Sequence, residues 1–138
     1  QQDCRLSARY IGDAVGLSAS ATQRRLTALR ANGVIQKEVA LVDPSVLGRD
    51  LTLIIEVVLE NDNTEVVKRF CESVENYSAV LHFYYVTGPA DYVIIFKAKN
   101  MDEYDAFSQE VFFKNDHVKT FNTKVVIKQI KTETALPI

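Results

Sequence analysis

The four residues Gly88-Pro89-Ala90-Asp91 could hold a small charged ligand. Glycine has no side chain to cover its backbone N–H, and a short loop with exposed N–H groups can bind a carboxylate. Asp91 adds a fixed carboxylate that could pair with an ammonium group, which needs a partner when it is buried. The loop therefore suits a small zwitterion. The alternative is a plain hairpin turn.

A second group of polar side chains lies on a predicted helix over residues 19–32. Ser18 and Ser20 lie at its start, where backbone N–H groups and the helix dipole favour phosphate. Gln23 and Arg24 follow one turn later and suit base-edge contacts. The candidate DNA contacts are Ser18, Ser20, Gln23, Arg24, Arg25 and Arg30.

Alternatives stay open for this helix. Arg25 either lies at DNA or anchors the helix to its own domain. The helix as a whole is either a DNA reader or part of a solvated helical pair whose arginines are merely exposed. A ligand sensor without DNA binding would need a neutral helix here, and Arg24, Arg25 and Arg30 argue against it.

A helix pair must position these side chains. Ser7 is a suitable N-cap for a helix over residues 8–15, which Gly16 ends, and Ser18 caps the helix that follows. Helix, glycine turn and helix form the helix-turn-helix pattern, and Gly12 suits a close crossing of the two. Because two helices bury little apolar surface, we expect a third helix upstream of this winged-helix-like pair.

The remainder of the chain predicts an α+β domain of ferredoxin-like βαββαβ order. Residues 51–60 alternate as a strand, and a helix follows from about Thr64. Two aromatic strands flank the 88–91 loop, a second helix starts after Asn100 with a capping-box-like Glu103, and a last strand lies within 118–131. Both helices should cover one face of a four-stranded antiparallel sheet.

The predicted sheet leaves its other face apolar. Ile54 and Val58 alternate out of the core, and an uncovered apolar face marks an interface. We therefore expect a symmetric homodimer packed sheet to sheet, which would also present two helices to two DNA half-sites. Residues 34–35 and 39–42 predict short connector strands, whose open edges could pair with a second copy.

The domain organisation follows from these elements. We expect a helix-turn-helix domain over 1–35, a connector over 36–50, and an oligomerising domain over 51–138. Residues 1–49 carry seven basic and four acidic side chains, a net charge of +3, and the remainder carries −5. This asymmetry favours an anionic partner for the first domain. No run of residues suits a membrane span or a signal peptide, and two isolated cysteines, Cys4 and Cys71, favour a cytoplasmic setting.

Four motifs together resemble the Lrp/AsnC, or feast/famine, family of transcription regulators. They are Leu17-Ser18-Ala19-Ser20-Ala21-Thr22-Gln23-Arg24-Arg25-Leu26 with Gly33-Val34-Ile35, then Leu41-Val42-Asp43-Pro44 with Leu47-Gly48, then Tyr85-Val86-Thr87-Gly88-Pro89-Ala90-Asp91-Tyr92, and the tail Lys131-Thr132-Glu133-Thr134-Ala135-Leu136-Pro137-Ile138. Their order and separations span nearly the whole chain.

The resemblance implies a transcriptional regulator that binds double-stranded DNA. It also implies an effector-binding domain that forms dimers and often octamers, with an amino-acid effector near the 88–91 loop. The residues that the resemblance and the loop chemistry indicate for the effector are Gly88, Pro89, Ala90, Asp91, Tyr92 and Tyr104. The tyrosines either wall the pocket or belong to the core.

Catalysis is the reading that the sequence favours least. His82 and His117 are the only histidines, and neither lies in a motif with Asp, Glu or Cys. We therefore expect no enzyme activity, no catalytic residue, no metal site and no cofactor. Effector identity, operator sequence and the sign of regulation are not encoded in any motif of a single chain.

Overall fold

The computed structural model describes residues 1–61 and 63–137 and divides into two compact units. The first holds Gln1–Leu41 together with the C-terminal tail from Ile130, and the second is Val42–Gln129. The division predicted from the sequence, with a separate connector over 36–50, stays a prediction. Within the described ranges, no helix is long and apolar enough to cross a membrane.

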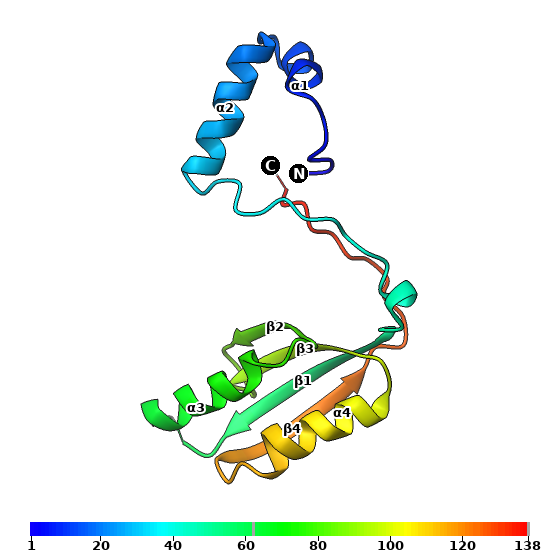
Figure 1. Ribbon diagram of the computed structural model, residues 1–138. Helices are drawn as coiled ribbons and strands as arrows, with labels where there is room; N and C mark the ends of the chain where they lie inside the picture. The colour runs from blue at the N-terminus through cyan, green and yellow to red at the C-terminus, as the bar shows by residue number, and fades with distance from the viewer. Residues whose placement is uncertain (62, 138) are drawn as a thin grey trace. The chain divides into compact units, whose positions relative to one another are not determined.

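The first unit contains the predicted helix pair, α1 (Ala8–Val15) and α2 (Ala19–Ala31) (Figure 1). Ser7 caps α1 by accepting from the Tyr10 N–H, and Gly16 ends it with a φ of 71°. A left-handed residue at this position satisfies the last carbonyls of a helix, and glycine adopts it without strain. Both predicted helices and both predicted start signals are therefore confirmed.

Gly12 allows α1 to cross α2 closely. A Cβ on this residue would lie 2.6 Å from the Leu17 carbonyl oxygen and 2.8 Å from the Thr22 hydroxyl. Thr22 is the buried residue of α2, and its hydroxyl donates to the Ser18 carbonyl at 3.1 Å. A methyl group at position 12 would have to push the loop between the helices away from the pair.

We expect Gly12→Ala to lower the free energy of unfolding of the helix pair by about 1–3 kcal/mol, because overpacking costs that much. Asp13→Ala, on the exposed side of the same helix, is the control and should change little. Hydrogen exchange of the 8–31 segment measures the effect separately from the second unit. Equal protection in the two variants would show that the crossing tolerates a side chain.

The second unit is a four-stranded antiparallel sheet with two helices on one face (Figure 1). Its strands run in the spatial order β2-β3-β1-β4. The elements follow the predicted βαββαβ order, which confirms the ferredoxin-like fold: β1 (Leu51–Leu59), α3 (Thr64–Glu75), β2 (Val80–Tyr85), β3 (Tyr92–Ala98), α4 (Met101–Ser108) with a π-helical turn (Gln109–Phe113), and β4 (Val118–Val125).

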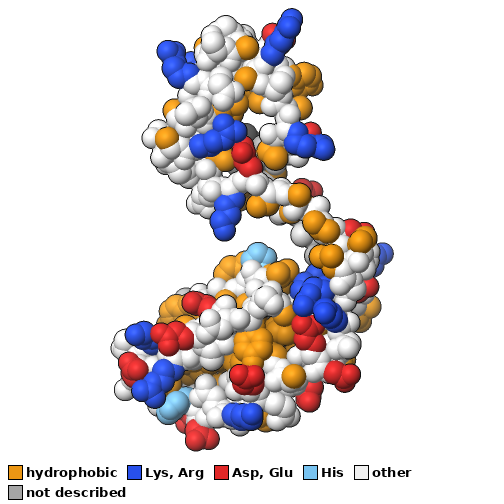
Figure 2. All heavy atoms as spheres, viewed as in Figure 1, with side chains coloured by type: hydrophobic (Ala, Val, Ile, Leu, Met, Phe, Trp, Pro, Cys, Tyr) orange, Lys and Arg blue, Asp and Glu red, His pale blue; other side chains and the backbone are white. Residues whose placement is uncertain are grey.

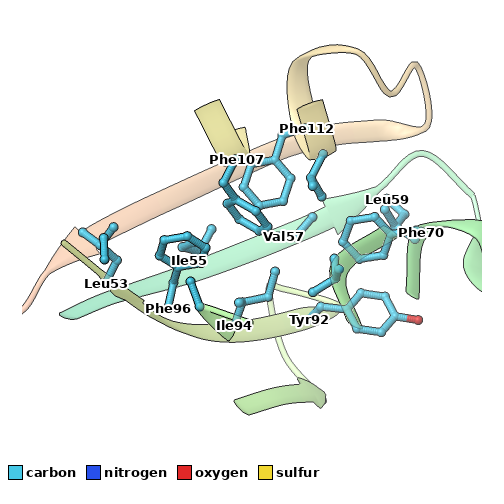
Figure 3. Close-up of a cluster of buried hydrophobic side chains, with 14 residues drawn as sticks. Leu53, Ile55, Val57, Leu59, Phe70, Tyr92, Ile94, Phe96, Phe107 and Phe112 are labelled. Atoms are coloured by element: carbon cyan, nitrogen blue, oxygen red, sulfur yellow. The ribbon is translucent and has the colours of Figure 1, made fainter. Parts of the chain in front are cut away.

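The hydrophobic core lies between the sheet and the two helices (Figure 3). The alternation of β1 sends every second residue into it, as the sequence predicts. The π-helical turn at the end of α4 adds a further aromatic side chain from Phe112. The largest side chains that are almost fully buried are Phe70, Phe96, Phe107, Leu53, Ile55 and Ile94.

The opposite face of the sheet is not covered by any described element of this unit. Backbone register places Ile54 beside Ile95, and Glu56 beside Val93 on β3. On the other side Glu56 pairs with Asn122 of β4. These side chains are half-buried or exposed, and the face mixes apolar groups with a few polar ones.

The connector differs from the sequence prediction. Residues 34–35 and 39–42 form no strand among the described residues, so that prediction is wrong for the single chain. Val39, Leu41 and Val42 are exposed instead. A strand needs hydrogen-bonded neighbours, and β-branched composition alone does not supply them. Asp43 caps a short 3₁₀ turn, Pro44–Leu47, that leads toward β1.

An ion pair ties the start of β1 to α4. The Arg49 guanidinium binds the Glu103 carboxylate at 3.1 Å and donates to the Lys97 carbonyl at 2.8 Å. Glu103 also accepts from the Lys99 N–H, and that hydrogen bond and Arg49 hold the pKa of Glu103 below its usual range. Asn100 caps α4 as predicted, whereas Glu103 reaches one residue further back than a capping box requires.

Candidate nucleic-acid interface and ligand pocket

The start of α2 carries a cluster of hydroxyl groups. Ser18 Oγ accepts from the Ala21 N–H at 3.3 Å and lies 3.2 Å from Ser20 Oγ. The first turn of α2 contains no acidic residue. A helix N-terminus with free N–H groups, hydroxyl groups and no carboxylate is suited to a phosphate.

The exposed face of α2 carries its long polar side chains. Thr22 is only 3% exposed and marks the side that packs on α1. Because a helix turns by about 100° per residue, Arg24 points almost opposite to Thr22. Gln23, Arg24 and Arg25 are all exposed, and none makes a side-chain hydrogen bond or ion pair within residues 1–61 and 63–137. Figure 2 shows basic side chains standing out from this unit.

The structure changes the predicted set of DNA contacts at two residues of α2. Arg30 binds Glu38 at 2.7 Å, so its guanidinium is directed to the connector segment. Thr27, absent from the prediction, is exposed and lies four residues after Gln23 and three after Arg24. That spacing puts Thr27 on the same helix face. The i+3 and i+4 rule could have identified it from the sequence.

Hydrogen bonds fix the 88–91 loop between β2 and β3. Asp91 donates its N–H to the Val57 carbonyl at 2.9 Å, and its own carbonyl accepts from the Val86 N–H at 2.9 Å. The Asp91 carboxylate accepts from the Leu59 N–H at 2.8 Å. Gly88 has a φ of 124°, a conformation that favours glycine. Asp91 therefore anchors the loop to the end of β1.

A hollow of about 390 Å³ lies beside this loop, on the face of the sheet that the helices do not cover. Its floor comes from β1 and β3, and its sides come from the loop and from β4. The residues that line it are Glu56, Val58, Val86, Thr87, Pro89, Ala90, Val93, Thr120, Phe121 and Asn122. The sequence-based prediction contained Pro89 and Ala90 but missed the strand residues, although alternation marks Glu56, Val58 and Val93 as outward-facing.

Glu56 is the ionised residue in the lining of the hollow. The Lys124 ammonium donates to one carboxylate oxygen, and the Asn122 amide lies 3.4 Å from the other. The hydrogen bond from Lys124 is the main reason that the pKa of Glu56 is lowered. The carboxylate is therefore charged at neutral pH and remains partly open to solvent.

The two predicted tyrosines lie on the other face of the sheet. Tyr92 is 6% exposed and packs against Phe70, with ring centroids 5.4 Å apart (Figure 3). Tyr104 lies on α4, packs against Phe96, and its hydroxyl binds the Thr123 hydroxyl. Neither residue lines the hollow. The structure thus brings Pro89 and Ala90 together at the hollow and places Tyr92 and Tyr104 in and around the core.

We expect Tyr92 to make stability fall at alkaline pH. Burial raises the pKa of Tyr92 to about 12, so the folded state keeps a proton that the unfolded state releases above about pH 10. This contribution is complete below pH 10 and is lost as the pH rises toward 12. Between pH 8 and pH 11 the parent should lose about 1 kcal/mol more than Tyr92→Phe in urea unfolding. Equal losses of stability in the parent and in Tyr92→Phe would mean that the Tyr92 hydroxyl is exposed to water in the folded state.

The helix pair and the ferredoxin-like unit define a helix-turn-helix regulator with a ligand-binding domain. Two family models match the chain, the AsnC-type helix-turn-helix domain over residues 1–30 and the Lrp/AsnC ligand binding domain over residues 52–136. The chain therefore belongs to the Lrp/AsnC family of DNA-binding transcriptional regulators. The resemblance found in the sequence is confirmed.

Individual relatives match over the full length of this chain. An HTH-type transcriptional regulator of Sinorhizobium fredii is 43% identical over 138 residues, covering 100% of this chain and 82% of the relative. The DNA-binding transcriptional activator DecR of Escherichia coli K12 is 30% identical, with coverage of 100% and 91%.

Solved structures of related regulators have the same fold as this chain. An AsnC family regulator from Agrobacterium tumefaciens has a TM-score of 0.91 at 30% identity, covering 99% of this chain and 89% of that one. A regulator of Neisseria meningitidis, solved as a complex with L-methionine, has a TM-score of 0.89 at 27% identity, covering 96% and 86%.

Proposed function

We propose that this regulator binds an amino acid in the hollow beside the 88–91 loop, and that binding changes its assembly or its affinity for DNA. The observation that carries the proposal is the hollow itself, which joins a glycine-containing loop to a charged carboxylate. The Neisseria relative solved with L-methionine supports the choice of ligand class. An effector acts only when it binds one state better than another.

The loop supplies the carboxylate end of the proposed site. Within the described residues, neither the Gly88 nor the Ala90 N–H has a hydrogen-bond partner, and of these two residues Ala90 lines the hollow. Pro89 has no N–H to donate and shapes the wall instead. Asp91 fixes the loop through Leu59, while Tyr92 and Tyr104 support the site from the core rather than by contact.

For DNA, we propose that α2 enters the major groove. Ser18 and Ser20 would bind phosphate at the helix N-terminus, and Gln23 and Arg24 would contact base edges. Around the helix axis, Thr27 lies between Gln23 and Arg24, on the same face. The remaining predicted residues, Arg25 and Arg30, would contribute positive charge near the DNA. Arg30 also forms an ion pair with Glu38.

Assembly completes the proposal. The uncovered sheet face suits a second copy packed sheet to sheet, which would close the hollow on that face, and a homodimer presents two α2 helices to two half-sites. Octamers are the higher assembly that the family resemblance implies. Cys4 and Cys71 are free thiols, which supports a cytoplasmic protein.

The test is fluorescence anisotropy on DNA from upstream of the regulator's own gene, against scrambled DNA, across a salt series. Specific binding should be orders of magnitude tighter than binding to the scrambled control. Each amino acid is then added in turn, and at least one should shift the binding curve. Equal, weak, strongly salt-dependent binding to both DNAs would instead favour a sensor of this fold without specific DNA recognition.

A further inference from the structure

We propose that the outer edge of β2 pairs with the same edge of a second copy, as two antiparallel strands related by a two-fold axis. This contact goes beyond the sheet-to-sheet homodimer of the proposed function, which uses the face of the sheet and not its edge. With both contacts in place, one homodimer can join another. The inference therefore assigns a surface to assembly beyond the homodimer.

The backbone of β2 is open on its outer side. β2 lies at one end of the sheet, in the order β2-β3-β1-β4 (Figure 1). The Val86 N–H, just after the strand, donates inward to the Asp91 carbonyl at 2.9 Å. Successive residues of a strand direct their N–H and C=O groups to opposite sides, so those of Phe83 and Tyr85 point outward. Among the described residues, no strand pairs with this edge.

The charge of the edge favours a copy of itself as the partner. Residues 76–90 contain no Asp, Glu, Lys or Arg, in a chain in which 25% of the residues are charged. β4, the other edge strand, carries Lys119 and Lys124. Lysine keeps edge strands from pairing, and like charges opposite each other destabilise a pair. The β2 edge has neither obstacle to pairing with itself, and it offers no charge to a charged peptide.

The side chains of this edge are large and exposed. Leu81 is exposed, Tyr84 is 49% exposed, and Tyr85 is 80% exposed. The register of β2 against β3 shifts between Val80 and His82, so the regular part of the edge begins at His82. An exposed, apolar edge strand is prone to pair with another chain, because it leaves both backbone groups and apolar surface open.

The outward backbone groups select one register. Phe83 and Tyr85 each present an N–H donor and a C=O acceptor. Antiparallel pairing of Phe83 in one copy with Tyr85 in the other uses all of these groups and needs none from the irregular start of the strand. The two-fold axis then passes between the two copies of Tyr84. They form a non-hydrogen-bonded pair, with Cα atoms about 4.5 Å apart, in which aromatic side chains contact each other.

The experiment is disulfide trapping in the full chain, with Cys4 and Cys71 replaced by serine. Tyr84→Cys brings two thiols together across the axis, within the Cα separation of about 4.4–6.8 Å that a disulfide requires. Tyr85→Cys is the matched control. Each copy of that residue faces Phe83 instead, so its two Cα atoms are more than about 7 Å apart and cannot be bridged. Both variants are treated with oxidised glutathione, and non-reducing electrophoresis measures the covalent dimer.

Most of the Tyr84→Cys protein should become a covalent dimer, and the Tyr85→Cys protein should remain largely uncrosslinked. Random collision would give the opposite order, because Tyr85 is more exposed than Tyr84. Absence of the crosslink in Tyr84→Cys would overturn the inference. An equal or stronger crosslink in Tyr85→Cys would overturn it as well.

A second variant separates the edge of the sheet from its face. Tyr84 pairs with Val93, on the side away from the core, so a contact between sheet faces could also bring its copies together. Tyr85→Pro removes an outward N–H, and proline is tolerated on an edge strand. Added to Tyr84→Cys, it should abolish the crosslink, whereas Tyr85→Val keeps the N–H and should retain it. A crosslink that survives Tyr85→Pro would belong to the face and would overturn the edge pairing.

Failure of the sheet-to-sheet homodimer has a different signature. Sedimentation equilibrium gives the native mass of the crosslinked Tyr84→Cys protein. A mass of two or more covalent dimers would support both contacts. A mass of one covalent dimer would refute the sheet-face contact of the proposed function and leave the edge contact in place.

Discussion

Phe107→Ala is expected to lower the free energy of unfolding of the C-terminal unit by about 3–5 kcal/mol, the cost of deleting a fully buried phenylalanine. Phe107 is 1% exposed. Its ring centroid lies 4.5 Å from that of Phe96, 4.8 Å from Tyr77 and 5.3 Å from Phe112. These rings come from β3, the segment after α3, and the π-helical turn, so no single element can move to fill the cavity.

Phe113→Ala is the matched control, since it deletes the same side chain six residues later. Phe113 is 63% exposed, and its ring packs against that of Phe121, at 5.2 Å between ring centroids. Its loss should cost less than about 1 kcal/mol. Urea unfolding followed by far-ultraviolet circular dichroism measures both, because the chain contains no tryptophan. Similar losses in the two variants would mean that Phe107 is not at the centre of the core.

The sequence predicts this core well because the period of its apolar residues matches the geometry of its elements. Alternation along β1 sends Leu53, Ile55 and Val57 to one side, and all three are fully buried. The helix ends were predictable for a similar reason. Ser18 and Gly16 act through hydrogen bonds and backbone angles within four residues of their own position, and local sequence holds that information.

Long-range contacts limit the prediction of the sites. The loop sequence shows that Asp91 carries a carboxylate, but not that the Leu59 N–H, 32 residues earlier, binds it. Glu56 becomes part of the hollow only through the register of β1 against β3 and β4. The sequence could have predicted which face of the sheet Tyr92 lies on, because Tyr92 alternates in step with Ile94 and Phe96, which are buried.

Arg24→Ala is expected to weaken binding to the operator far more than binding to scrambled DNA. A bidentate contact from arginine to guanine contributes about 1–3 kcal/mol of discrimination. In the proposed homodimer each copy loses one such contact, so the total is about 2–6 kcal/mol, or roughly thirtyfold to twenty-thousandfold in affinity. The exposed guanidinium opposite Thr22, which has no ion-pair partner within the described part of the chain, is the structural reason for choosing Arg24.

Arg25→Ala provides the comparison, since it removes the same charge from the next residue of α2. A helix turns about 100° between neighbours, so the two side chains leave the helix in different directions. If Arg25 contacts only phosphate, its loss should weaken binding to the operator and to scrambled DNA equally. It should also make the salt dependence of binding less steep. An equal loss on both DNAs with Arg24→Ala would move Arg24 to the phosphate-binding class. Unchanged affinity would remove Arg24 from the interface, leaving Gln23 and Thr27 as the base-reading candidates on that face.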